Sequence, residues 1–241
     1  MNSRPAAALT FVLLIAGSAA TAGEVRIFLN GLYNLSSLKY SDSRTVTEFA
    51  ETGSLDTSYE GKKGPGVEGG FQYNFTRSLG AAASFAWLGR DATASYSASL
   101  PHPLYLNQPR KVSGDVDGLK FRETAVHVDL VVGGRSGSLR FGVFAGPSFF
   151  KIEGDLLDRI TYSHTYPYDT VTVTGTPLVK GDDNPIGFNA GGGLDYVLGA
   201  HGALGIQARF SRSKAELAAD QGVVKVDVGG LDVAFGVRIY F

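Results

Sequence analysis

Cysteine is absent from the 241-residue chain, methionine and tryptophan each occur once, and only 19% of the residues are charged. Without cysteine, the chain can form neither a disulfide-stabilised scaffold nor a thiolate metal or redox site. The net charge is −1, so no excess of either sign favours nucleic acid or another polyanion as a partner. Mean hydropathy is near zero, which excludes a bundle of membrane helices. The enriched residues are instead glycine, with 32 copies, and aromatic residues, with 15 Phe and 11 Tyr.

The N-terminal segment has the three parts of a secretory signal peptide. Arg4 precedes a short apolar run, and the segment closes with the small residues "ATA" at positions 20–22. The run is shorter than the roughly 20 apolar residues that a membrane-spanning helix needs. We therefore predict a signal peptide over residues 1–22, cleavage after Ala22, and one β-barrel domain over residues 23–241.

The last eleven residues, "LDVAFGVRIYF", alternate between apolar and other side chains. A period of two indicates a β-strand with one face in an apolar medium. Seven further segments show the same alternation, and each is near the length of a tilted strand that crosses a bilayer. The eight segments are residues 24–35, 66–75, 79–87, 123–134, 139–150, 186–198, 203–210 and 231–241.

Short and long connections alternate between these segments. The short ones are rich in Gly and Ser, as in tight turns, whereas the long ones are polar and contain Tyr. A soluble β-sandwich has no reason to separate loop lengths in this way. We therefore predict an all-β protein, an eight-stranded antiparallel up-and-down transmembrane β-barrel. Its expected long loops are Ser36–Gly64, Ala92–Lys120 and Gly154–Asn184, with a shorter one at Ser213–Gly222.

Aromatic side chains support lipid as the apolar medium, because they collect near the ends of the strands. Aromatic residues in membrane barrels concentrate at the two membrane interfaces. With odd-numbered strands running outward, we predict an outer girdle and a periplasmic girdle, although five other phenylalanines lie deeper. The outer girdle is Tyr33, Trp87, Phe149 and Phe210, and the periplasmic girdle is Tyr73, Phe75, Tyr196 and Phe241.

The opposite face of the strands carries four acidic and four basic residues. Paired charges are tolerated in a narrow interior where isolated charges are costly, so we predict a lumenal charge network. The alternative is a selectivity lining around a narrow water-filled path, which small lumenal residues leave open, although eight strands enclose little space. The predicted network is Arg26, Glu68, Asp129, Arg140, Asp195, Arg209, Asp232 and Arg238.

The glycine- and aromatic-rich strands, such as "GVEGGFQYNF" followed by "SLGAAASFAW", and the ending "GVRIYF" resemble small bacterial outer-membrane barrels. These include the opacity proteins, the membrane part of OmpA and the OmpW group. The resemblance implies the bacterial outer membrane as location, with its lipid and lipopolysaccharide as partners. It also implies a signal for the barrel-assembly machinery, carried by Phe235, Val237, Ile239 and Phe241.

The sequence contains only weak candidates for catalytic residues. Some outer-membrane lipases use a Ser–His pair, but His127, beside Asp129 on the lumenal face, has no serine in its local pattern. Asp182 and Asp183 in "GDDNP" suggest a carboxylate pair or a calcium site, yet such acids before Asn-Pro are more typical of a solvated turn. No phosphate loop, zinc spacing or cofactor fingerprint occurs. We expect no catalytic residue, no metal and no cofactor.

The loops are the remaining place for a function. Residues 159–175 alternate Tyr and Thr, which predicts that two strands continue beyond the membrane as a hairpin. Exposed tyrosines suit a binding surface for an extracellular ligand, and the alternative is a rigid loop that covers the barrel mouth. We expect a passive surface role, in envelope integrity or loop-mediated adhesion. The alternatives are a narrow channel for small or hydrophobic solutes, as the OmpW resemblance implies, and a lipid A-modifying enzyme.

Overall fold

The computed structural model describes residues 23–219 and 222–241, and the predicted signal peptide lies outside the described residues. In these ranges, no helix is long and apolar enough to cross a membrane. The described chain forms thirteen strands, which are β1 (Glu24–Asn34), β2 (Leu38–Glu48), β3 (Glu51–Gly61), β4 (Gly64–Asn74), β5 (Leu79–Leu100), β6 (Arg110–Ser136), β7 (Leu139–Leu157), β8 (Thr161–Ser163), β9 (Thr172–Gly175), β10 (Leu178–Asp183), β11 (Ile186–Val197), β12 (Gly202–Ala219) and β13 (Gly222–Tyr240).

Eight of these strands form a closed antiparallel ring in the order β1-β4-β5-β6-β7-β11-β12-β13. The ring closes where the first strand pairs with the last, from Arg26 opposite Tyr240 to Asn34 opposite Asp232. Closure removes the unpaired edge that an open sheet would expose. Each of the eight predicted segments lies in one ring strand, so the prediction of an eight-stranded antiparallel barrel is confirmed.

Alternation along each ring strand turns apolar side chains outward and polar ones inward. Leu29, Val143 and Phe235 are 63%, 62% and 61% exposed on the outside of the ring. Asn30, on the strand of Leu29, and Arg238, on the strand of Phe235, are 1% and 2% exposed on the inside. The protein is therefore inverted relative to a soluble barrel, with the apolar surface outside and the polar groups enclosed.

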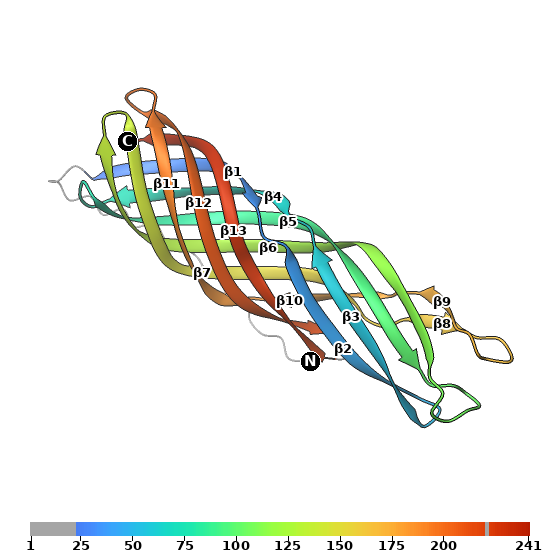
Figure 1. Ribbon diagram of the computed structural model, residues 1–241. Helices are drawn as coiled ribbons and strands as arrows, with labels where there is room; N and C mark the ends of the chain where they lie inside the picture. The colour runs from blue at the N-terminus through green and yellow to red at the C-terminus, as the bar shows by residue number, and fades with distance from the viewer. Residues whose placement is uncertain (1–22, 220–221) are drawn as a thin grey trace.

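The prediction of long loops is wrong, because most of these residues form strands. β5, β6, β7, β12 and β13 continue past the ring. β3 pairs with β5, β2 pairs with β3, and β10 pairs with β7. In Figure 1, the ring lies at the end that carries the C-terminus, and β2, β3, β8 and β9 lie toward the opposite end. We call this second part the outer extension. Residues 159–175 do contain a hairpin, β8 and β9, but it forms a separate two-stranded sheet and is not a continuation of two ring strands, as the sequence predicted.

The outer extension has its own apolar core. Leu217 of β12 is fully buried and packs against Gly154 of β7 and Gly181 of β10, which lie opposite each other. A Cβ atom at residue 181 would lie 3.0 Å from Cβ of Leu217, so these glycines make room for the leucine. Other core residues exposed by 3% or less include Leu55, Tyr59, Leu119, Phe121, Phe150, Ile152, Leu156, Val224, Val226 and Val228.

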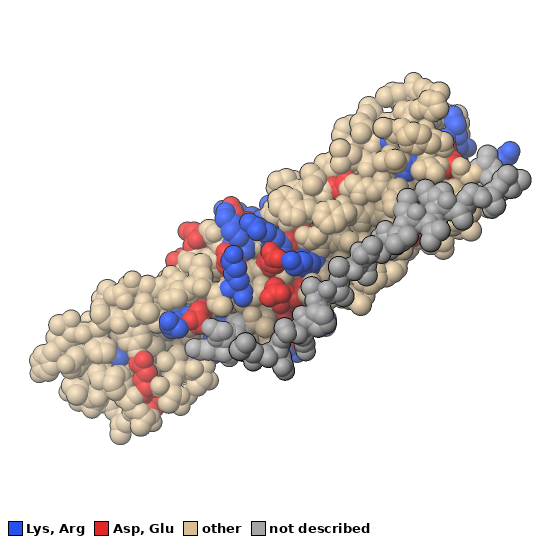
Figure 2. Space-filling model, turned by 180° about the vertical axis from the view of Figure 1, so that it is seen from behind, with Lys and Arg blue, Asp and Glu red and all other residues tan. Residues whose placement is uncertain are grey.

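Charged side chains gather on the outer surface where the strands leave the ring. Figure 2 shows them crossing the middle of one face, between two largely uncharged ends. They form cross-strand and same-strand pairs, such as Lys120–Asp91 at 2.6 Å and Lys151–Glu153 at 2.8 Å. We call this zone the charged belt, and its members include Asp91, Lys120, Arg122, Lys151, Glu153, Arg212 and Asp227.

Candidate functional site: the barrel lumen

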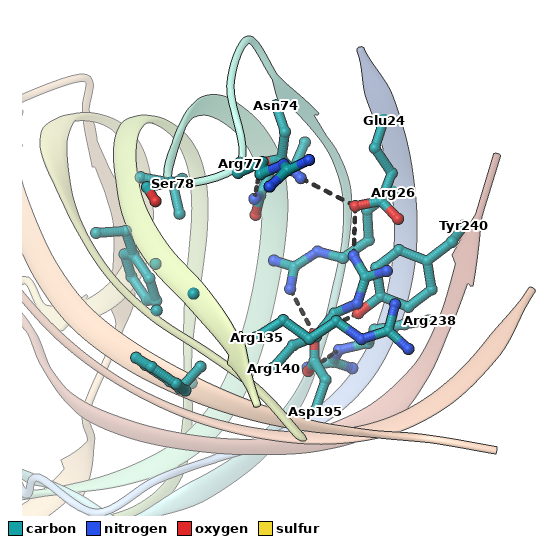
Figure 3. A pocket seen from close by; sticks show the side chains of 18 of the residues that line it. Glu24, Arg26, Asn74, Arg77, Ser78, Arg135, Arg140, Asp195, Arg238 and Tyr240 are labelled. Atoms are coloured by element: carbon teal, nitrogen blue, oxygen red, sulfur yellow. Dashed lines mark hydrogen bonds and ion pairs between the residues drawn. The ribbon is translucent and has the colours of Figure 1, made fainter. Parts of the chain in front are cut away.

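The first lumenal cluster centres on Asp195 of β11, near the end of the ring with the short turns. Its Oδ2 accepts hydrogen bonds from Arg26 Nη1 at 2.6 Å and from the Tyr240 hydroxyl at 2.8 Å. Its Oδ1 accepts one from Arg238 Nε at 3.0 Å. Figure 3 shows these side chains converging from β1, β11 and β13. A Cβ atom at Gly205 would lie 2.7 Å from Cζ of Arg238, so a larger residue there would displace the side chains of this cluster.

The second cluster lies in the middle of the ring around Glu68 of β4. Its carboxylate accepts hydrogen bonds from Asn30 at 3.0 Å, Gln207 at 2.9 Å and Arg209 at 2.6 Å. Arg209 also reaches Asp129 at 3.3 Å. All five side chains belong to residues that are 7% exposed or less. Hydrogen bonds of this kind offset part of the cost of burying the charges.

The third cluster joins β6, β7 and β11. Asn189 donates to Asp129 at 2.8 Å and to the Ser148 hydroxyl at 3.0 Å. Ser148 Oγ lies 2.7 Å from Nδ1 of His127. The sequence offered no serine near His127 along the chain, but β7 places Ser148 directly opposite it. The only sequence signal was that both residues fall on the inward face of their strands.

Together these contacts tie all eight ring strands to one another. Arg238 donates to Asn30, which connects the first cluster to the second, and Arg209 reaches Ser84 of β5 at 3.2 Å. Asp129 belongs to both the second and the third cluster. The network predicted from the sequence contained charged residues only. It missed the amide and hydroxyl side chains that connect them, which are Asn30, Ser84, Ser148, Asn189, Gln207 and Tyr240.

Two of the predicted network residues have other partners. Arg140 pairs with Glu24, which the sequence had not marked, and its guanidinium lies 4.1 Å from the ring centre of Tyr240. Asp232 accepts a hydrogen bond from Asn34 at 2.8 Å. Among the described residues, Asp232 has no basic side chain within 4.0 Å. The carboxylate partners of these two residues therefore differ from those of the three clusters.

Aromatic rings pack against the small lumenal residues and fill space that the sequence left open for a water-filled path. Phe28 and Phe144 point into the lumen, so they are exceptions to the pattern of apolar side chains outside and polar side chains inside. A Cβ atom would lie 2.7 Å from Phe28 Cζ at Gly70 and 2.6 Å from Phe144 Cζ at Gly191. Phe144 lies 5.0 Å from the guanidinium carbon of Arg209, within cation–π range. The glycines therefore allow aromatic packing inside the ring.

A cavity of about 380 Å³ remains at the short-turn end of the lumen. Arg77 of the β4–β5 turn and Arg135 at the end of β6 line it together with Arg140 and Asp195 (Figure 3). Toward the middle of the ring it meets the buried Glu68 cluster. The cavity is therefore confined to one end of the barrel and does not pass through the lumen.

A sequence model of the outer membrane protein β-barrel domain matches residues 6–238. The chain belongs to this family. The outer-membrane protein OprG from Pseudomonas aeruginosa shares the fold, with a TM-score of 0.56 and 12% identity over 91% of this chain and 96% of OprG. Ail of Yersinia pestis, solved with the heparin analogue sucrose octasulfate, matches with a TM-score of 0.42 and 14% identity over 92% of this chain and 100% of Ail. No curated protein sequence matches the chain.

Because the chain belongs to a family of outer-membrane β-barrels, its outward apolar surface faces the lipid of the membrane. The structure places both predicted girdles on that surface. Tyr33, Trp87, Phe149 and Phe210 are each more than 40% exposed, on the ring side of the charged belt. Tyr73, Phe75, Tyr196 and Phe241 are likewise exposed, near the short turns. Their roles as interface anchors stay predictions.

The C-terminal strand of this outer-membrane barrel is anchored to its last residue. The backbone of Phe241 donates to Val25 at 2.9 Å and accepts from Val25 at 3.2 Å. Phe235, Val237, Ile239 and Phe241 all face outward. Their reading by the assembly machinery stays a prediction.

The predicted turn at Asp182 and Asp183 is wrong, because both residues belong to β10. Asp183 accepts hydrogen bonds from the backbone of Asn184 at 2.8 Å and of Glu216 at 2.7 Å, which ties β10 to β12. The carboxylates therefore have a structural use. Across the part of the chain that the structure describes, no cluster of three or more His, Asp or Glu side chains could hold a metal ion.

Proposed function

We propose that this outer-membrane barrel is a non-conducting, non-enzymatic surface protein that is exported by its signal peptide. In this proposal, the ring anchors the outer extension in the envelope and the extension makes the external contacts. The observation that carries the proposal is the filled middle of the lumen, where Glu68, Asp129 and Arg209 are 2%, 4% and 5% exposed.

A second barrier lies beyond the polar clusters. Phe121, Ile152, Leu217 and Val226 of the extension core are 1% exposed or less. An ion that moved along the barrel axis would have to displace the Glu68 cluster and then enter this apolar core. The cost of transferring a charge into such surroundings supports a closed barrel.

The tip of the outer extension supports a role in surface contact. Phe49, Leu104, Leu106 and Tyr166 are 48%, 57%, 71% and 77% exposed there. Figure 2 shows that the end of the molecule beyond the charged belt carries few charges. Exposed apolar and tyrosine side chains are typical of binding surfaces.

The tip is also connected internally. The backbone of Asn107 in the β5–β6 loop donates to Glu51 of β3 at 2.6 Å. This hydrogen bond holds the β5–β6 loop against the start of β3. A surface that is preorganised in this way loses less conformational entropy on binding.

Conductance in planar bilayers tests the closed lumen. We expect the folded barrel, identified by its heat-dependent gel mobility, to insert without conductance steps. Reproducible single-channel steps would establish the narrow channel instead. If such steps are abolished or resized by Arg209→Ala, the current runs through the lumen rather than around the barrel.

Adhesion of bacteria that display the barrel to cultured epithelial cells tests the surface role. The variant Leu104→Ser/Leu106→Ser/Tyr166→Ser removes exposed tip side chains and leaves the core intact. We expect adhesion to fall. The matched control is Lys214→Ser/Lys225→Ser, on exposed sites of β12 and β13. Equal adhesion of all strains at equal surface expression would contradict the proposal.

A further inference from the structure

The wall of the barrel contains a bulge where β3 passes into β4. Gly61 lies opposite Ala92, and Gly66 lies opposite Leu88. Four residues, Lys62–Pro65, therefore face only three, Gly89–Asp91. The extra residue makes a β-bulge, a feature that redirects side chains and interrupts pairing.

A cleft of about 370 Å³ opens at this bulge. Four basic side chains line it, namely Lys62 and Lys63 from the bulge and Lys120 and Arg122 from β6. Asp91 is the acidic residue among the lining side chains, and it pairs with Lys120 at 2.6 Å. The exposed side chains of the cleft thus carry a net charge of about three positive units, because Lys and Arg are protonated at neutral pH.

Arg90 also borders the cleft but belongs to the interior. Its side chain pairs with Glu123 at 3.4 Å, and the residue is 6% exposed. The positive charge of the cleft therefore comes from side chains that no buried acid neutralises.

The cleft lies at the level of the predicted outer girdle, which includes Trp87. Trp87 lines the cleft and is 42% exposed on the outward face of the ring. On the same outward face of β5, Phe85 precedes Trp87 and Asp91 of the charged belt follows it. A Cβ atom at residue 89 would lie 3.1 Å from the Trp87 ring, so Gly89 leaves the ring accessible beside the bulge.

We propose that this cleft binds the phosphorylated glucosamine head group of lipopolysaccharide in the outer leaflet. Lysine and arginine form charge-assisted hydrogen bonds with phosphate oxygens. A sugar ring packs on an exposed indole, since Trp combines an apolar face with a polar edge. The acyl chains then continue along the apolar wall of the ring. The inference rests on membership in the outer-membrane family and is independent of whether the lumen conducts.

Trp87 is the single tryptophan of the chain, so its fluorescence reports on the cleft directly. The experiment titrates the full barrel in phosphatidylcholine nanodiscs with lipopolysaccharide, with chemically dephosphorylated lipopolysaccharide and with inorganic phosphate. We expect a saturable change in Trp87 emission with intact lipopolysaccharide. The change should need a much higher concentration of the dephosphorylated lipid and be absent with phosphate.

Lys62→Ala/Lys63→Ala should weaken binding of intact lipopolysaccharide by about tenfold or more, because each basic residue contributes to attraction at an anionic lipid surface. Lys111→Ala/Lys225→Ala removes the same charge from exposed sites elsewhere and should bind as the unaltered barrel does. Heat-dependent gel mobility confirms that each variant is folded. Equal affinities of the two variants, equal affinity for the dephosphorylated lipid, or the same emission change with inorganic phosphate would each overturn the proposal.

Discussion

Arg209 on β12 donates a 2.6 Å hydrogen bond to Glu68 on β4, across the middle of the lumen. The two side chains are 6% and 2% exposed, and the strands that carry them are separated in the ring by β13 and β1. The pair therefore acts as a brace through the lumen that the sheet hydrogen bonds do not provide. It also occupies the space through which an open pore would have to pass.

Removing one partner of this brace should destabilise the barrel strongly. Glu68→Ala leaves Arg209 with Asp129, at 3.3 Å, as its one remaining carboxylate partner, and breaking a buried pair on one side costs about 3–5 kcal/mol. Urea unfolding in lipid vesicles, followed by Trp87 emission, measures the loss. In Glu68→Ala/Arg209→Ala the cost should be smaller than the sum of the single losses, because the two residues interact. Losses below about 1 kcal/mol for both single variants would show that the brace carries little stability.

The Ser148–His127 pair has the spacing of a nucleophile and a base, but we expect no chemistry from it. Ser148 is 0% exposed and His127 is 2% exposed, so no substrate carbonyl reaches the hydroxyl. Ser148→Ala should leave the lipid A profile of the cells unchanged in mass spectra. It should lower the free energy of unfolding by about 1 kcal/mol, the usual value of one hydrogen bond. An altered lipid A profile would establish an enzyme.

Alkaline pH should loosen the outer extension before the ring. Tyr40 and Tyr59 stack with their ring centres 4.5 Å apart, and burial is the main cause that raises the pKa of each hydroxyl. Because the folded-state pKa lies above the unfolded value of about 10, the neutral rings stabilise the extension fully below pH ~10. That stability is lost as the pH rises above this value toward the folded-state pKa.

Limited proteolysis between pH 8 and pH 11 follows this change. Cleavage in the extension should rise above pH ~10, and less steeply in Tyr40→Phe, which keeps the ring and removes the ionisable hydroxyl. Tyr33→Phe, on the exposed outer girdle, is the matched control and should behave as the unaltered barrel does. Identical pH profiles for all three proteins would refute the assignment.

Leu217 should contribute strongly to the stability of the extension core. It is fully buried beside Gly154 and Gly181, and Leu→Ala in such a site costs about 2–5 kcal/mol. Leu217→Ala should make the extension sensitive to protease while the ring keeps its heat-dependent gel mobility. Lys214→Ala, exposed on the same strand, should have no effect. Loss of the ring in Leu217→Ala would show that the extension and the ring fold as one cooperative unit.

The extension shows where prediction from the sequence failed. In the ring strands, large apolar residues alternate with polar ones, because lipid lies on one side and the lumen on the other. In the extension, β5 continues as Ala92, Ala94, Tyr96 and Ala98 inward, against Thr and Ser outward. These small residues read as a polar loop. Only the neighbouring strands, which bring Leu217, Ile152 and Phe121 over them, make them a core.

The lumen shows a similar division. The sequence assigned all eight charges of the predicted network to the inward face, because a two-residue period fixes the side of a strand. The pairing is set by the ring instead. Strand register and curvature bring Asp195 to Arg26 and Arg238, direct Arg140 to Glu24, and leave Asp232 with Asn34.

By itself, the sequence determined the number of ring strands, their order around the barrel and which face of each ring strand is apolar. These features depend on local alternation and on the lengths of the links. Only the tertiary structure decided that Ser148 meets His127, that glycines admit Phe28 and Phe144, and that the apparent loops form a second core. Each of these depends on residues that are distant in the chain, and closure of the ring sets the distances between them.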